Sequence, residues 1–117
     1  MSDFWRDRSV LLTGAGGFLG SWLAKRLAGS GAELTCVVRD RPKWSGVPYA
    51  GVIYGDVTDQ AFMERVIGES RAMTVFHLAA QAQVCVANSN PVSTFDTNVR
   101  GTWSVLEACR RSPLVEQ

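Results

Sequence analysis

Short apolar stretches alternate along the chain with longer segments in which apolar residues recur every three or four positions. Four short stretches rich in β-branched residues predict strands at residues 9–13, 34–38, 52–54 and 74–79. The first has the continuous apolar centre expected of a strand buried on both faces of a sheet. Strands that alternate with helices predict an α/β fold with a parallel sheet.

A helix is predicted directly after the first strand. From Leu19 to Leu27 the apolar positions have helical spacing, and Gly29 and Gly31 would end the segment. We expect this helix to bury one stripe against the sheet, formed by Leu19, Trp22, Leu23, the aliphatic stem of Arg26, and Leu27.

Two further helices follow the third and fourth strands. Thr58 or Asp59 can cap one that runs to Gly68, with an expected buried face of Phe62, Met63, Val66 and Ile67. Asn90 and Pro91 form a cap and first-turn pair for the other, whose expected stripe is Phe95, Val99, Thr102, Trp103, Leu106 and Cys109 or Arg110. Right-handed crossovers would arrange these elements as a Rossmann-type doubly wound sheet of strand order 3-2-1-4, ending after the helix that follows strand four.

Length and composition fit one water-soluble domain over residues 1–117. Hydrophobic residues make up 46% and charged residues 20% of the chain, a balance typical of a folded core. Twelve Lys and Arg and eleven Asp and Glu are mixed along the sequence, which argues against nucleic-acid or anionic-membrane binding. No apolar run reaches the roughly 20 residues of a membrane span, and no secretory signal is present, so we expect a cytoplasmic protein.

The cysteines and the single histidine do not predict a metal site. Cys36, Cys85 and Cys109 lack CxxC spacing, which favours small buried apolar roles over a disulfide framework or a zinc site. His77 lies inside an apolar run, where a packed core imidazole is expected.

The segment between the first strand and the first helix carries a glycine motif. Glycines at positions 14, 17 and 20 form a G-x-x-G-x-x-G arrangement in the strand-turn-helix context that such motifs require. Gly14 would permit a tight turn, Gly17 would let backbone N–H groups approach a pyrophosphate, and Gly20 would let the helix pack close to the strand. The alternative is a glycine turn that holds no ligand.

Charged residues follow the second strand, where a dinucleotide fold reads the adenosine ribose. Asp40 lies 20 positions after Gly20 and could accept hydrogen bonds from the ribose hydroxyls of NAD. Arg39 or Arg41 could instead pair with the 2′-phosphate of NADP. Both cofactors stay open, as does a role of these residues as solvated loop charges.

Three more segments reach the same edge of the predicted sheet. Asp56 could accept a hydrogen bond from the adenine amino group, with Val57 beside the ring, or Asp56 could only cap the next helix. Residues 79–81 place two small side chains near the crevice where strand order reverses. Asn98 and residues 101–102 could equally be packing and surface positions.

These blocks together resemble the extended short-chain dehydrogenase/reductase superfamily, in its NAD-dependent epimerase/dehydratase branch. The matching blocks are residues 13–20, 55–59, 77–81 and 97–102. Within the branch, further segments are similar to nucleotide-sugar 4,6-dehydratases of the CDP-glucose or GDP-mannose type: residues 4–5, 20–24, 90–98 and 106–110. That resemblance implies oxidation of a sugar at C4 by bound NAD(P)+, elimination of water, and return of the hydride at C6.

The resemblance also implies a set of cofactor contacts. The pyrophosphate would meet Gly14, Gly17 and Gly20 and the backbone of Phe18 and Leu19. The ribose would meet Arg39 and Asp40, and the adenine would meet Asp56 and Val57. The nicotinamide would lie beside Ala79, Ala80 and Gln81, with Asn98 as a helix position near the cofactor.

The catalytic Tyr-x-x-x-Lys pair of this superfamily is not in the sequence. The only tyrosines, Tyr49 and Tyr54, are followed four positions later by Ile53 and Thr58. The family's remaining strands and its sugar-binding lobe are also missing, so no catalytic residue is assigned and we expect no dehydratase activity from these residues alone. We expect a dinucleotide-binding portion of a longer enzyme, or a truncated gene product, that binds a nucleotide sugar only together with that lobe.

Two alternatives remain beside this interpretation. One is a non-catalytic module that uses a dinucleotide, or nothing, as its ligand. The other is an assembly part that completes its sheet with a partner chain. Because the fourth strand would expose an edge and apolar faces, we also expect self-association through the strand-four side.

Overall fold

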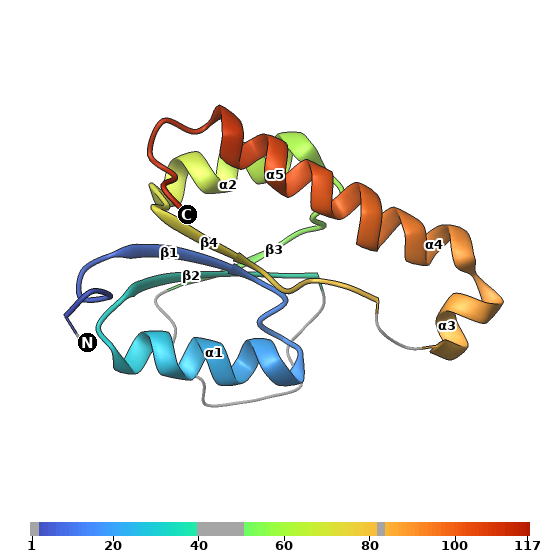
Figure 1. Cartoon of the computed structure of the whole chain (residues 1–117), viewed down its shortest axis with the longest axis horizontal. Coiled ribbons are helices and arrows are strands. Elements are labelled where there is room, and N and C mark those ends of the chain that lie inside the picture. The colour runs from blue at the N-terminus through green and yellow to red at the C-terminus, as the bar shows by residue number, and fades with distance from the viewer. Residues whose placement is uncertain (1–2, 40–50, 82–83) are drawn as a thin grey trace.

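Four parallel strands form the central sheet (Figure 1). The computed structural model describes residues 3–39, 51–81 and 84–117. The strands pair in the order β3-β2-β1-β4, which confirms the predicted fold class and strand order. Their bounds are Ser9–Thr13 for β1, Glu33–Val38 for β2, Gly51–Tyr54 for β3 and Thr74–His77 for β4.

Helices cover both faces of this sheet (Figure 1). The helix α1 (Phe18–Gly29) packs on one face, and α2 (Gln60–Ser70) and α5 (Gly101–Arg111) pack on the other. Leu11 belongs to the core under α2 and α5, whereas Leu12 belongs to the core under α1, and both are fully buried. Burial on both faces therefore accounts for the continuous apolar centre of β1.

The buried face of α1 differs from the predicted stripe. Leu19 and Trp22 are 67% and 56% exposed, and Arg26 is exposed as well. The buried residues are Gly20, Ser21, Ala24 and Leu27. A Cβ on Gly20 would overlap the carbonyl oxygen of Gly14, so the first turn of α1 lies too close to the glycine turn for any side chain at this position. Close packing at this end of α1 thus buries small residues and leaves Leu19 and Trp22 outside, whereas Leu27 is buried as predicted and Leu23 is half-buried against the core.

The last predicted helix is a succession of three elements. Asn90 caps α4 (Pro91–Phe95), as predicted, by accepting a hydrogen bond from the backbone N–H of Ser93. A π-helical turn, η1 (Asp96–Arg100), follows and leads into α5.

Most of the stripe predicted for this helix faces solvent instead of the sheet, whereas Cys109, also predicted, packs against the core. Phe95, Val99, Trp103 and Leu106 are between 48% and 67% exposed. The buried residues of α5 are Gly101, Ser104, Val105 and Ala108. A Cβ on Gly101 would lie 2.9 Å from Cγ2 of Val57, so close approach again selects small residues for the buried face.

The predicted second helix is confirmed as α2. Asp59 accepts a hydrogen bond from the backbone N–H of Phe62 at 3.1 Å and so caps the helix. Met63, Val66 and Ile67 are buried, and Phe62 is half-buried. The short helix α3 (Val84–Ser89) has no counterpart among the predicted elements.

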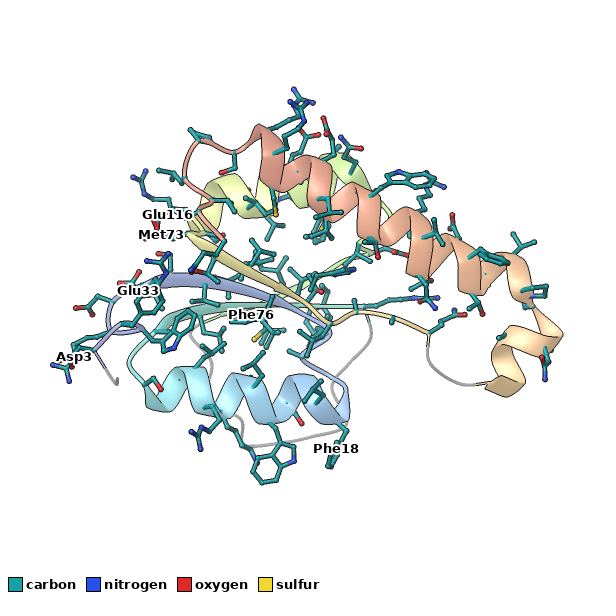
Figure 2. All side chains as sticks on the ribbon, in the orientation of Figure 1. Asp3, Phe18, Glu33, Met73, Phe76 and Glu116 are labelled. Carbon is teal, nitrogen blue, oxygen red and sulfur yellow. The ribbon has the colours of Figure 1, made fainter. Side chains whose placement is uncertain are left out.

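Part of the outer edge of β4 is paired by the last residues of the chain. Val75 donates its backbone N–H to the carbonyl oxygen of Gln117 at 2.9 Å, and Gln117 donates to that of Met73 at 3.3 Å, a parallel pattern. Arg8, whose side chain is 13% exposed, holds this segment through Glu116 at 2.7 Å. Figure 2 shows Glu116 beside Met73 at this corner of the sheet.

The described residues contain no helix long and apolar enough to cross a membrane. They also contain no cluster of three or more His, Cys, Asp or Glu side chains that could hold a metal ion. Cys36 is buried in β2, and this burial raises its pKa to about 12, so its thiol stays protonated at neutral pH.

Candidate dinucleotide-binding site

The glycine turn brings the end of β1 against the segment that follows β4. Gly14 has a φ of +77°, a left-handed conformation that favours glycine. A Cβ at Gly14 would lie 2.6 Å from the carbonyl carbon of Leu78 and 2.7 Å from the nitrogen of Ala79. Gly14 therefore serves both the turn and the close approach of the two chain segments.

The start of α1 is open and has no side-chain cap. Its N-cap residue, Gly17, has an extended backbone and no side chain, and the first turn carries no acidic residue. Gly17, Phe18 and Leu19 are exposed, and Phe18 points away from the sheet in Figure 2. A helix start of this kind presents unpaired N–H groups and partial positive charge, which suit an anion. By contrast, α2 is capped by Asp59.

Thr13 ties β1 to the end of β4. Its buried hydroxyl oxygen accepts hydrogen bonds from the backbone N–H groups of Leu78 at 3.1 Å and Ala79 at 3.2 Å. The same oxygen lies 2.7 Å from Nδ1 of His77. His77 is half-buried and its burial lowers its pKa. The sequence pattern marked His77 only as a packing residue, because its partner lies 64 positions earlier.

Gln81 and Asn98 bind each other. Asn98 accepts a hydrogen bond from the backbone N–H of Gln81 at 2.7 Å and donates to its carbonyl oxygen at 3.0 Å. The Gln81 side chain donates to Ser93 and accepts from Thr94, both at 2.9 Å. These contacts attach the segment after β4 to α4 and η1, so the polar groups of both residues already have partners within the chain.

Asp56 lies exposed just after β3. Its Oδ1 accepts hydrogen bonds from the backbone N–H and the hydroxyl of Thr58, both at 2.9 Å. Partial burial raises the pKa of Asp56, but these two hydrogen bonds and the charges of Arg39 and Arg100 outweigh it and hold the pKa below its usual value. None of the described residues donates to Oδ2, so this oxygen can accept a hydrogen bond from a ligand.

The remaining predicted site residues lie at the same edge of the sheet, with one exception. Arg39 is exposed directly after β2, whereas Asp40 lies outside the described residues. Ala79 is half-buried and Ala80 exposed after β4. The Val57 side chain is 5% exposed and packs in the core beside α5, so only its backbone is positioned to meet a ligand.

A separate groove lies between the start of α2 and the start of α5. It is lined by Thr58, Asp59, Gln60, Arg100, Trp103 and Ser104. None of the predicted cofactor residues lines it, so the glycine turn and this groove are distinct surfaces.

Comparison with known protein families shows which family has this arrangement of strands and glycine turn. The sequence model of a family described as the NAD dependent epimerase/dehydratase family matches residues 10–116. The chain belongs to that family. This confirms the resemblance drawn from the sequence blocks. It also agrees with the glycine turn, the strand order and the open start of α1, which all lie within the matched region.

Curated members of the epimerase/dehydratase family align with nearly the whole chain. A CDP-glucose 4,6-dehydratase of Salmonella typhimurium is 34% identical over 93% of the chain and 32% of its own length. A GDP-mannose 4,6-dehydratase of Vibrio cholerae is 32% identical over 88% of the chain and 31% of its own length. The chain thus spans about a third of the length of these relatives.

Solved structures of epimerases share the fold. The UDP-glucose 4-epimerase of Thermus thermophilus in complex with NAD has a TM-score of 0.81 and is 36% identical, over 90% of this chain and 34% of that one. The UDP-glucose 4-epimerase of Brucella ovis in complex with NAD has a TM-score of 0.80 and is 35% identical, over 88% and 32% of the two chains. Again the match covers about a third of the longer proteins.

Proposed function

We propose that this chain binds NAD or NADP at the glycine turn, as the cofactor-binding portion of an oxidoreductase related to nucleotide-sugar epimerases and dehydratases. The observation that carries the proposal is the open start of α1. Gly17 supplies no side-chain cap there, so backbone N–H groups of the first turn can donate hydrogen bonds to a diphosphate. Gly14 and Gly20 support it, because the close packing that they permit holds the glycine turn between the segment after β4 and the first turn of α1. We treat residues 1–117 as one binding domain.

Each part of the dinucleotide has candidate partners. Backbone groups of the glycine turn would hold the pyrophosphate, the ends of β2 and β3 would meet adenosine, and the segment after β4 would lie along the nicotinamide. The glycine-turn residues are Gly14, Gly17, Phe18, Leu19 and Gly20. The adenosine residues are Arg39, Asp40, Asp56 and Val57. The nicotinamide residues are Ala79, Ala80 and Gln81, and Asn98 holds Gln81 in place.

The residues present fit binding better than turnover. A bound nicotinamide would supply hydride transfer, but the Tyr-x-x-x-Lys pair that exchanges the substrate proton is not encoded in these 117 residues. We therefore propose that nucleotide-sugar binding and the lyase or epimerase step require protein beyond this third of the family's length. Free thiols at Cys36 and Cys109 favour a reducing compartment such as the cytoplasm.

Calorimetric titration with NAD+, NADH, NADP+ and NADPH tests this function. We expect saturable binding of at least one pair. An Arg39→Ala variant tests the role of Arg39: loss of affinity confined to NADP(H) would assign Arg39 to the 2′-phosphate, whereas unchanged binding of all four dinucleotides would leave recognition of the ribose to Asp40. The absence of binding by all four dinucleotides would contradict the proposal.

A second role, as an assembly module, is favoured by the outer face of α4, η1 and α5. Val92, Phe95, Val99, Trp103 and Leu106 are 48% to 76% exposed and form what we call the outer stripe. Their spacing of three, four, four and three positions is symmetric about Val99. In an antiparallel two-fold contact centred on Val99, residues at equal distances before and after Val99 meet across the axis, so this spacing places apolar residues opposite apolar residues.

We propose that a second copy of this chain covers the outer stripe in antiparallel orientation. Exposure of five large apolar residues along one continuous face favours burial against a partner. The edge of β4, where self-association was expected from the sequence, is partly paired by residues 116–117 and offers fewer free groups.

A further inference from the structure

The buried hydroxyl of Thr13 has three polar neighbours between the end of β1 and the segment after β4. Its oxygen accepts from the backbone N–H groups of Leu78 and Ala79, and Nδ1 of His77 lies 2.7 Å away. A hydroxyl group carries one proton and two lone pairs. Because two N–H donors occupy both lone pairs, the hydroxyl proton must go to the third neighbour, Nδ1 of His77.

We infer that His77 is a positioning residue for the dinucleotide site, held as the neutral tautomer that carries its proton on Nε2. In this state Nδ1 accepts the Thr13 hydroxyl proton. The Thr13 oxygen is then fixed with both lone pairs toward the backbone of Leu78 and Ala79. This inference rests on the proposed function, because the segment that His77 positions is the one assigned to the nicotinamide side.

The segment after β4 has two anchors, and only one of them can titrate. At its far end, the backbone N–H of Gln81 is held by Asn98, an amide that keeps its hydrogen-bonding pattern at any pH. At its near end, Thr13 and His77 hold Ala79 against Gly14, where the fit leaves no room for a Cβ. The protonation state of His77 therefore controls how firmly the near end is held.

Protonation of His77 breaks the arrangement at an identifiable group. A hydrogen on Nδ1 would face the hydroxyl proton of Thr13, so the oxygen would have to turn a lone pair toward His77 and release one N–H donor. Leu78 keeps a second acceptor, the carbonyl oxygen of Thr13 at 3.2 Å, whereas Ala79 donates to the hydroxyl alone. Release of the Leu78 N–H leaves that group its second acceptor, whereas release of the Ala79 N–H would leave that group without a partner. In either case the hydroxyl holds one backbone N–H of this segment instead of two, so the near end is held less firmly.

Burial opposes this protonation and lowers the pKa of His77. The neighbouring β1 faces His77 with the uncharged Thr13, and no charged side chain of the described residues shifts the His77 pKa. Loss of the near anchor is thus expected only on the acid side of the usual histidine range, about 6.5.

The tautomer can be measured without any ligand. His77 is the single histidine of the chain, so one long-range 1H–15N correlation spectrum of the imidazole reports it without ambiguity. We expect a protonated Nε2 and an unprotonated, hydrogen-bonded Nδ1 at pH 7.5. A hydrogen on Nδ1, or rapid exchange between the two tautomers, would overturn the inference whether or not the chain binds a dinucleotide.

Two variants separate the hydrogen bond from the bulk of the ring. His77→Asn keeps an acceptor near the position of Nδ1, whereas His77→Phe keeps a ring without an acceptor. We expect His77→Phe to raise the Kd for NAD+ about tenfold, the scale of one buried hydrogen bond. His77→Asn should restore affinity to within about threefold of the wild type and should abolish the weakening of binding between pH 7 and pH 5. Equal losses in both variants, or a wild-type affinity independent of pH, would contradict the inference.

Amide hydrogen exchange supplies a readout that needs neither ligand nor variant. On acidification of the wild-type chain, protection of the Ala79 N–H should fall before protection of the Gln81 N–H, whose acceptor does not titrate. Parallel loss of protection at both amides would show that His77 does not act on the near anchor. If NAD+ fails to bind but this difference and the tautomer are found, the proposed function fails while the role of His77 stands.

Discussion

Gly20 and Gly68 are both helical glycines, but they differ in what a side chain would meet. A Cβ on Gly20 would overlap the Gly14 carbonyl oxygen, whereas a Cβ on Gly68 would meet nothing within 4 Å. We expect Gly20→Ala to lower the free energy of unfolding by about 1–3 kcal/mol and to abolish dinucleotide binding. Gly68→Ala should raise it by about 0.5–1 kcal/mol, with binding unchanged.

Urea denaturation and calorimetry of the two variants test this contrast. The matched chemistry of the substitutions removes helix propensity as an explanation of any difference. Similar changes in stability for both variants would contradict the close approach of α1 to the glycine turn.

The charge of Asp56 is a second feature of single residues that can be tested. Since its pKa is lower in the folded protein, the carboxylate stabilises the fold above the unfolded value of about 3.9, and this contribution is lost as pH falls through the lower, folded pKa. Asp56→Asn keeps an oxygen for the Thr58 hydrogen bonds but removes the charge.

Thermal melts of wild type and Asp56→Asn between pH 7 and pH 3 measure this contribution. We expect the wild type to melt higher at neutral pH by a small margin, because Asp56 is exposed. The margin should close as the pH falls below 4. A margin that does not change with pH would show that Arg39, Arg100 and Thr58 do not favour the charged form.

Among the helices and strands, the sequence predicted the features that local periodicity controls. It did not predict which helix faces are buried, because that depends on how closely the helices pack. The strands and the Asp59 cap were correct, except that β4 ends at His77, two residues before the predicted end, because alternation and capping are local properties. The buried faces of α1 and α5 were mostly wrong, although Leu27 is buried as predicted. Both helices approach neighbouring segments through small residues such as Gly20 and Gly101. Hydrophobicity alone cannot reveal a close approach, so the large apolar residues were assigned to the wrong side.

The outer stripe of α4, η1 and α5 gives the prediction at this scale. If a second copy covers it, Val99→Glu places two charges at the two-fold centre and should convert a dimer into a monomer. Trp22→Glu is the matched control, because Trp22 is also an exposed apolar residue but lies on α1. The molar mass in solution is measured by light scattering at a protein concentration on the order of tens of micromolar. A wild-type monomer, or dissociation by Trp22→Glu instead, would contradict this assignment of the stripe.

For the whole molecule, the pairings that complete the site connect residues far apart in sequence. Thr13 and His77 are separated by 64 positions, and Gln81 and Asn98 by 17. The glycine spacing and the strand ends could be predicted because each lies within one short segment. Reciprocal hydrogen bonds between distant segments follow from the fold, so no local pattern could reveal them.

Arg8, near the start of the chain, contacts residues near its end, so its replacement tests how much these contacts stabilise the whole fold. It donates to Thr74 at 2.9 Å and pairs with Glu116 at 2.7 Å, and its side chain is largely buried. We expect Arg8→Met to lower the free energy of unfolding by about 1–3 kcal/mol, because partly buried polar groups lose their donor.

Arg6→Met is the matched control for this change. Arg6 pairs with Asp3 at 3.6 Å through side chains that are 69% and 84% exposed. The effect of its removal should stay below about 0.5 kcal/mol in the same urea titration. Comparable losses from the two variants would contradict a structural role for the Arg8 contacts.

Backbone amide spectra of the 15N-labelled chain, recorded during a titration with NAD+, test the central claim most directly. We expect saturable shifts at the amides of Gly17, Phe18, Leu19 and Gly20, with smaller shifts at Ala79 and Ala80. Shifts confined to the groove beside Arg100 and Trp103, or no shifts at millimolar NAD+, would contradict it.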